Sequence, residues 1–414
     1  MIAVITIFGM MFPFLGLLII IVHYGYSRKY LFCALSFAFI ISIISYNFIN
    51  LSPLSDLYRY GLHALRLSDM SWSDSLRYEQ DIDANIKDLP LSIFFLWSVG
   101  HIGDMHLIPS ITAFFQYFVI AFILFDYIKE VKLKIISLFI FTIIVFSTVY
   151  YYGALNAIRS TIALSFGLLV LYLDVAKKVN KFVVYPLYLL PFLMHSIGLL
   201  PLVFRIIFPI TKKYPKSVFV LSLASIAILY AISPLVSGIS VLSFLEKVTT
   251  YIEDESEWSY VASTGTKWVL LKVLNIFFMI DSVALLFGFK SYFETNQSFS
   301  SVVQTEKEEI LWCTSIAGFG LMLAVALMVS VPSYLRFSYI IYPISTMYIL
   351  KYYLIYKRDS VLREQMGGAF LLGIILLLLL LVVLNYFYFH ELSSHVDMNA
   401  LITRLIFGVF SNQI

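Results

Sequence analysis

Runs of about 20 apolar residues, separated by shorter polar or charged segments, recur along the whole chain. A helix needs a run of about this length to cross the hydrocarbon core of a bilayer. Two further apolar stretches are ambiguous, because 90–103 is too short to cross comfortably and 182–209 contains several prolines, which interrupt helices. We therefore expect an all-α polytopic membrane protein with about 10–12 transmembrane or re-entrant helices. The pattern predicts spans at residues 3–23, 30–50, 107–128, 134–152, 159–176, 217–236, 269–289, 310–331, 335–356 and 368–389.

The composition supports a membrane protein without a sizeable soluble domain. Hydrophobic residues make up 61% of the 414-residue chain and charged residues 13%, and the mean hydropathy is +0.90. A water-soluble protein of this size carries about twice that charged fraction. We expect one integral membrane domain over residues 1–414 and no nucleic-acid partner. The two cysteines, Cys33 and Cys313, lie in apolar stretches, which favours packing roles over a disulfide or a zinc site.

The basic residues predict the orientation of the spans, because Lys and Arg concentrate in cytoplasmic loops. All the basic loops can share that side if 90–103 is a re-entrant or interfacial piece and 182–209 is a broken hairpin. Both termini and the polar segments 51–89 and 237–268 then lie outside, and the tail 390–414 forms an amphipathic interfacial helix. The basic loops contain Arg28 and Lys29; Lys129, Lys132 and Lys134; Lys177, Lys178 and Lys181; Lys212, Lys213 and Lys216; Lys290 and Lys307; and Lys351, Lys357, Arg358 and Arg363.

Unusual polar residues fall at four sites on or near the predicted outer face. A charged residue inside a membrane segment costs about 2.5–3.5 kcal/mol on insertion scales, so such residues are functional candidates. Arginine is disfavoured on the outer side of a membrane protein, so an anionic ligand is expected to offset its cost there. Because a guanidinium group binds phosphate oxygens bidentately, the arginines at these sites favour a diphosphate ligand. The sites are Asp56, Tyr58, Arg59 and Tyr60 in the first outer loop; Asn156 and Arg159 opening a helix; His195; and Arg336 at the outer end of a helix.

Each site also has a purely structural explanation. Arg159 and Arg336 can anchor their helices by extending to the lipid headgroups. Asp56 and Arg59 can form a solvated pair in a loop. His195 can be a core histidine bonded to a backbone carbonyl, and taken alone this is the better interpretation of it. The outer location shared by the arginines is what favours a functional cluster.

Three short motifs resemble those of a known family. They are "D-x-Y-R-Y" at 56–60, "N-x-x-R-x-x-x-A" at 156–163 and "F-x-x-H-S" at 192–196. This order resembles the bacterial O-antigen and exopolysaccharide polymerases, the Wzy-type and EpsG-like membrane proteins, over roughly residues 50 to 205. The family often has "N-x-x-R-Q", whereas Ser160 follows Arg159 here, so the role of that glutamine does not carry over.

The resemblance implies a lipid-dependent (GT-C-like) glycosyltransferase bundle in the bacterial cytoplasmic (inner) membrane. Such a protein polymerises O-antigen, capsule or exopolysaccharide repeat units on the outer face. The donor and the acceptor are both oligosaccharides linked to undecaprenyl diphosphate, and a chain-length regulator and a flippase are the expected partners. No cofactor and no metal are expected. The only outer D-x-D motif is "DID" at 81–83, in an acidic stretch, and we do not expect it to bind a metal.

The chemistry of the unusual residues suits this reaction. Departure of a lipid diphosphate develops negative charge, which fixed cations in a partly dry site stabilise. Asp56 and His195 are the candidates for a base, or for a group that orients the acceptor hydroxyl. The predicted catalytic residues are Asp56, His195 and Arg159, and the predicted substrate-binding residues are Arg59, Tyr60, Tyr151, Asn156 and Arg336.

Two other classes use similar residues. A flippase or transporter for the same lipid-linked sugars would also hold a diphosphate with arginines, but it should show inverted repeats and charges near the midplane, and neither is visible in the sequence. A membrane acyltransferase places a histidine in its cavity, often with an acidic partner, and His195 has no acidic neighbour in sequence.

Overall fold

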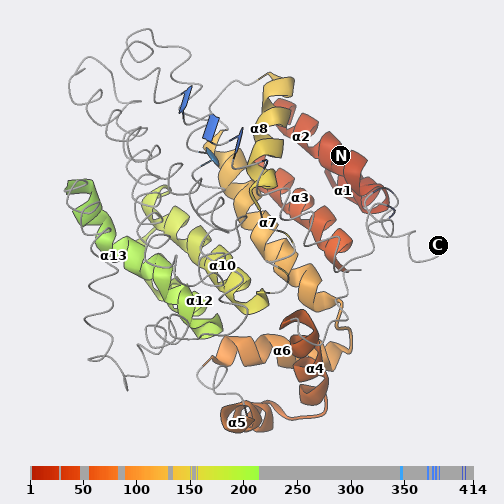
Figure 1. Cartoon of the computed structure of the whole chain (residues 1–414), viewed down its shortest axis with the longest axis vertical. Coiled ribbons are helices and arrows are strands. Elements are labelled where there is room, and N and C mark those ends of the chain that lie inside the picture. The colour runs from red at the N-terminus through yellow and green to blue at the C-terminus, as the bar shows by residue number, and fades with distance from the viewer. Residues whose placement is uncertain are drawn as a thin grey trace. The chain divides into compact units, whose positions relative to one another are not determined.

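The structure is a computed structural model in which the chain forms two compact units, residues 1–143, 150–202 and 387–414 in the first and residues 144–149 and 203–386 in the second. Every regular element within the described ranges is a helix (Figure 1). Most of these helices belong to the first unit. Asn156, Arg336, and the spans, outer segment and tail predicted after residue 213 lie outside the continuously described ranges. Those ranges are 2–27, 29–46, 56–82, 89–128, 134–149 and 157–213, with Tyr151, Leu155 and scattered positions after residue 345.

Within the described ranges, two helices are long and apolar enough to cross a membrane. They are α7 (Leu107–Tyr127), with 21 residues, and α10 (Ile158–Val175), with 18 residues. At about 1.5 Å per residue they are about 31 and 27 Å long, close to the roughly 30 Å hydrocarbon core of a bilayer. Their ends lie within one residue of the predicted spans 107–128 and 159–176.

The centre of the first unit is formed by α7 between α3 (Tyr30–Tyr46) and α10. The ring of Tyr30 lies 5.6 Å from that of Phe122 near one end of α7, and the hydroxyl of Tyr46 donates a 2.6 Å hydrogen bond to Asp104 at the other end. Helices α3 and α7 are therefore antiparallel. Their opposite directions agree with the alternation that the basic loops predict.

A polar network joins the C-terminal ends of α7 and α10. Asp126 on α7 is 3% exposed, forms an ion pair with Lys177 just after α10, and accepts a hydrogen bond from the hydroxyl of Tyr172. The ammonium group of Lys177 also lies 6.0 Å from the ring centroid of Tyr30. A buried carboxylate needs such partners because desolvation penalises its charged form. Helices α7 and α10 are thereby held parallel.

The first predicted span, 3–23, is not one straight helix. It is divided into α1 (Ile2–Met11) and α2 (Pro13–Ser27), because Pro13 has no N–H to continue the helical ladder. A side chain on Gly16 would place its Cβ 2.2 Å from the Cα of Gly9, so the two backbones meet where glycines permit it. The span predicted at 134–152 is also shorter, since α8 covers Ile135–Ser147.

The polar segment 51–89 contains two helices that the sequence analysis did not predict, α4 (Asp56–Leu67) and α5 (Trp72–Ile82). They pack with α6 (Pro90–Ile102) at the N-terminal ends of α7 and α10 (Figure 1). The 13-residue α6 is about 20 Å long, too short to cross a bilayer, as predicted for 90–103. A Cβ on Gly100 would lie 2.2 Å from the carbonyl oxygen of Ala64, so α6 and α4 make backbone contact there.

The predicted interruption of 182–209 is observed at two places, at Tyr188, which lies between Pro186 and Pro191, and at His195. Helices α11 (Lys181–Leu187) and α12 (Leu189–Met194) precede His195, and the 3₁₀ helix η1 (Ser196–Leu199) and α13 (Leu200–Lys213) follow it. The backbone of His195 is extended, with φ −162° and ψ 141°. Gly198 then folds back so closely on Pro191 that a Cβ there would lie 2.1 Å from the carbonyl oxygen of Pro191.

Candidate functional site

Arg159 is a buried cation at the N-terminal turn of a membrane-length helix. It is the second residue of α10 and is only 8% exposed. Its Nε donates a 2.7 Å hydrogen bond to the hydroxyl of Tyr60, and its Cζ lies 5.0 Å from the centroid of the same ring. Tyr60 therefore holds the guanidinium in two ways, through its hydroxyl and through its ring face.

Tyr60 reaches Arg159 because α4 is amphipathic. Positions three and four residues apart lie on one face of a helix. In α4 that face contains Leu57, Tyr60, Ala64 and Leu67, and the three apolar members are at most 7% exposed. Packing of this face turns Tyr60 toward α10, across 99 positions of sequence.

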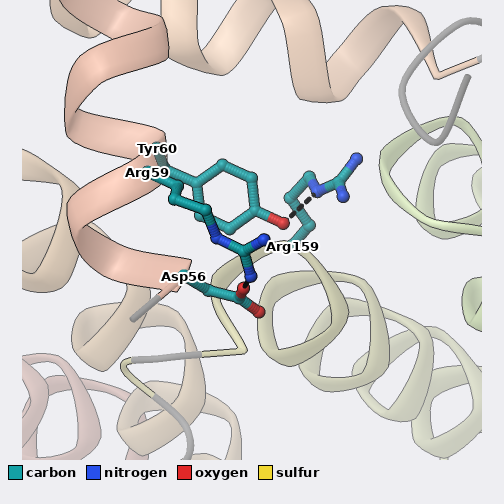
Figure 2. A network of polar contacts seen from close by, with 4 residues as sticks. All are labelled: Asp56, Arg59, Tyr60 and Arg159. Carbon is teal, nitrogen blue, oxygen red and sulfur yellow. Dashed lines mark hydrogen bonds and ion pairs between the residues drawn. The ribbon is translucent and has the colours of Figure 1, made fainter. Parts of the chain in front are cut away.

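Asp56 and Arg59 form a second polar pair on the first turn of α4. The Arg59 guanidinium makes a hydrogen-bonded ion pair with the Asp56 carboxylate beside the Tyr60–Arg159 pair (Figure 2). The Arg59 side chain is 61% exposed and that of Asp56 27%, so solvent weakens this pair. Asp56 also lies at the N-terminal turn of α4, where the helix dipole favours an anion. An exposed pair of this kind can open to accept a hydroxyl or an anion.

His195 has a local structural role. Its Nδ1 accepts a 3.1 Å hydrogen bond from the backbone N–H of Ile197 and so caps the 3₁₀ helix η1. In the neutral ring, an accepting Nδ1 places the proton on Nε2, which is then a donor and not a base. If the site contains a base, this geometry makes Asp56 a stronger candidate than His195.

Tyr151 is tied to α3 and α7. Its hydroxyl shares a 2.8 Å hydrogen bond with the hydroxyl of Ser45, and its ring lies 6.3 Å from that of Tyr117. Two neighbouring positions of α4 thus carry two polar pairs, Asp56 with Arg59 and Tyr60 with Arg159. The contacts described for Tyr151 and His195 lead to other elements.

Asp104, which lies between α6 and α7, is a polar residue that the sequence analysis did not single out. It accepts the Tyr46 hydroxyl at 2.6 Å, and its other carboxylate oxygen accepts the backbone N–H of His106 at 3.0 Å. The sequence could have indicated Asp104, because it is an acidic residue directly after a glycine. That glycine, Gly103, ends α6 in the left-handed region at φ 78°. Among the described residues, no group of three or more His, Cys, Asp or Glu side chains is placed to hold a metal ion.

Comparisons of the chain with models of protein families, with curated proteins and with solved structures find no match. The described residues themselves define a helical protein with two candidate membrane-spanning helices, α7 and α10. A polar cluster that contains buried Arg159 lies at the N-terminal end of α10.

Proposed function

We propose that this protein is a multi-pass polymerase of the bacterial cytoplasmic membrane that joins polysaccharide repeat units linked to undecaprenyl diphosphate at the outer face. The observation that carries the proposal is the hydrogen bond between Tyr60 and buried Arg159. It unites two motifs that resemble the polymerase family and lie about 100 positions apart in the sequence. The site would serve an anionic lipid-linked substrate at the end of the helix bundle.

Arg159 acts on the leaving group in this proposal. The acceptor hydroxyl attacks the anomeric carbon of the donor, the bond from that carbon to the phosphate oxygen breaks, and the lipid diphosphate leaves with the electron pair. A guanidinium fixed by Tyr60 at the N-terminal end of α10 would stabilise the charge that develops there. The backbone N–H groups of that helix end add to the same field.

Asp56 receives the acceptor proton. Its carboxylate lies on the turn that carries Tyr60, and its exposed partner Arg59 can transfer to a phosphate oxygen when substrate binds. Asn156, which precedes α10 by two residues, and Arg336 would contribute further donors to the substrate. The partners of such an enzyme are the lipid-linked donor and acceptor, a flippase that delivers them and a chain-length regulator.

Deletion of the gene tests the proposal. The deletion strain should carry glycan with a single repeat unit and lack the ladder of longer chains on a gel, and a plasmid copy should restore the ladder. A normal ladder in the deletion strain would contradict a polymerase. Loss of the single-unit product together with the ladder would instead identify the alternative function, a flippase for the lipid-linked oligosaccharide, because that step precedes every transfer outside.

A further inference from the structure

Helix α4 lies at the level where the two membrane-length helices end. Its Tyr60 contacts Arg159, the second residue of α10, and it packs on α6, which leads directly into α7 (Figure 1). Because α7 and α10 are about as long as the hydrocarbon core is thick, their ends fall near its boundary. With 12 residues, α4 is about 18 Å long and cannot cross the core.

The surface of α4 that does not face the protein is divided into two stripes. Tyr58, Leu62 and Leu65 form an apolar stripe at helical spacing, and its two leucines are 37% and 53% exposed. Beside it runs a basic stripe at the same spacing, formed by Arg59, His63 and Arg66. Adjacent apolar and basic stripes are the pattern of helices that lie in the plane of a membrane interface.

From this pattern we infer that α4 lies on the phosphate-bearing surface of the bilayer, with Leu62 and Leu65 inserted at the boundary between headgroups and acyl chains. Arg59 and Arg66 then extend to lipid phosphates, to which basic side chains are attracted. The opposite face of α4 carries Tyr60, so the helix separates the lipid from Arg159. The inference does not require the proposed function.

A second feature, on the helices α5 and α6 that pack with α4, favours contact of this region with lipid and not with water or a protein partner. Trp72 on α5 and Trp97 on α6 lie with ring centroids 5.8 Å apart, and the indole N–H of Trp97 donates a 2.9 Å hydrogen bond to the carbonyl of Met70. Phe94 on α6 joins this cluster and is 49% exposed. Tryptophan is enriched at membrane–water interfaces, where its ring is partly apolar and its N–H is bonded.

The position of α4 also fixes the depth of Tyr60 and Arg159 in the bilayer. If α4 lies at the headgroup level, Tyr60 and Arg159 lie at that level too, on the protein side of the helix. A phosphate group of a membrane lipid lies at the same depth, on the other side of α4 from Arg159.

Spin labels at single cysteines test this depth. The two native cysteines, Cys33 and Cys313, are first replaced by serine. The full-length protein is labelled at Leu62→Cys, Leu65→Cys or Arg66→Cys, reconstituted in liposomes of phosphatidylethanolamine and phosphatidylglycerol, and checked for a monodisperse size-exclusion profile. The collision rate of each label with oxygen, which concentrates in lipid, is then compared with that of a water-soluble nickel chelate.

Two further labels calibrate the measurement. Asp69→Cys, in the exposed turn after α4, is the water reference, and Ile140→Cys, 52% exposed on apolar α8, is the lipid reference. We expect the oxygen-to-nickel ratio at positions 62 and 65 to be at least threefold above that at 69 and to approach that at 140, with 66 between them. Ratios at 62 and 65 equal to that at 69 would overturn the inference in favour of a solvated helix. Labels at 62 and 65 shielded from both reagents would overturn it in favour of a protein surface.

Discussion

The substitution Tyr60→Phe isolates the contribution of one hydroxyl to the candidate site. It removes the oxygen that accepts the Arg159 Nε–H at 2.7 Å and leaves the ring 5.0 Å from Cζ. A hydrogen bond to a charged group contributes about 1.5–3 kcal/mol, and Arg159 is too buried for water to replace the partner freely. If the bond orients the guanidinium in the transition state, its loss slows chain extension by about 10- to 150-fold, since about 1.36 kcal/mol corresponds to a tenfold change in rate.

The assay uses purified protein in liposomes with lipid-linked repeat units extracted from the deletion strain, and it follows chain extension per mole of folded protein. Tyr26→Phe is the control, because it removes a hydroxyl from a side chain that is 76% exposed near the end of α2, and its rate should stay within about twofold of wild type. Extension by Tyr60→Phe at the wild-type rate would refute the claim that Tyr60 positions Arg159.

The remaining predictions concern packing, the exposed carboxylate and the opposite end of the bundle. Gly100→Ala forces a Cβ to within 2.2 Å of the Ala64 carbonyl oxygen and should lower the free energy of unfolding by about 1–3 kcal/mol. Gly61→Ala on α4 is the control, because its Cβ meets nothing within 4 Å and should leave the stability unchanged. Thermal unfolding in detergent measures both variants. Asp56→Ala should reduce chain extension at unchanged membrane abundance, because an exposed pair contributes little stability, and a normal glycan ladder would contradict this. Asp126→Asn breaks a buried ion pair and should lower the unfolding midpoint; an unchanged midpoint would show that the network is dispensable.

Long apolar runs were the part of the fold that the sequence predicted well. The predicted spans 107–128 and 159–176 match α7 and α10 within one residue, because a charged segment follows each run. The sequence analysis did not predict the bend of the backbone inside the first apolar run. Pro13 divides the first span into α1 and α2, and hydropathy alone does not register a lost hydrogen bond.

The candidate site was predicted only in part, because its geometry depends on a helix that was read as a loop. The alternation of Leu57, Tyr60, Ala64 and Leu67 at helical spacing was available in the sequence, but polar residues between them favoured a loop. The pairing of Tyr60 with Arg159 could not be predicted, since no local pattern specifies a contact between distant segments. The local capping role of His195 likewise depends on an extended backbone that the sequence did not indicate.

Replacement of Arg159 tests the central claim most directly. Arg159→Ala and Arg159→Lys are expressed in the deletion strain at matched membrane abundance, and the chain-length distribution of the glycan is read from a gel. The proposed diphosphate site predicts single-unit glycan for alanine and a shortened ladder for lysine, because a point charge cannot replace a bidentate fork of donors. A full ladder from an abundant alanine variant would show that Arg159 only anchors its helix, and the proposed site would be wrong.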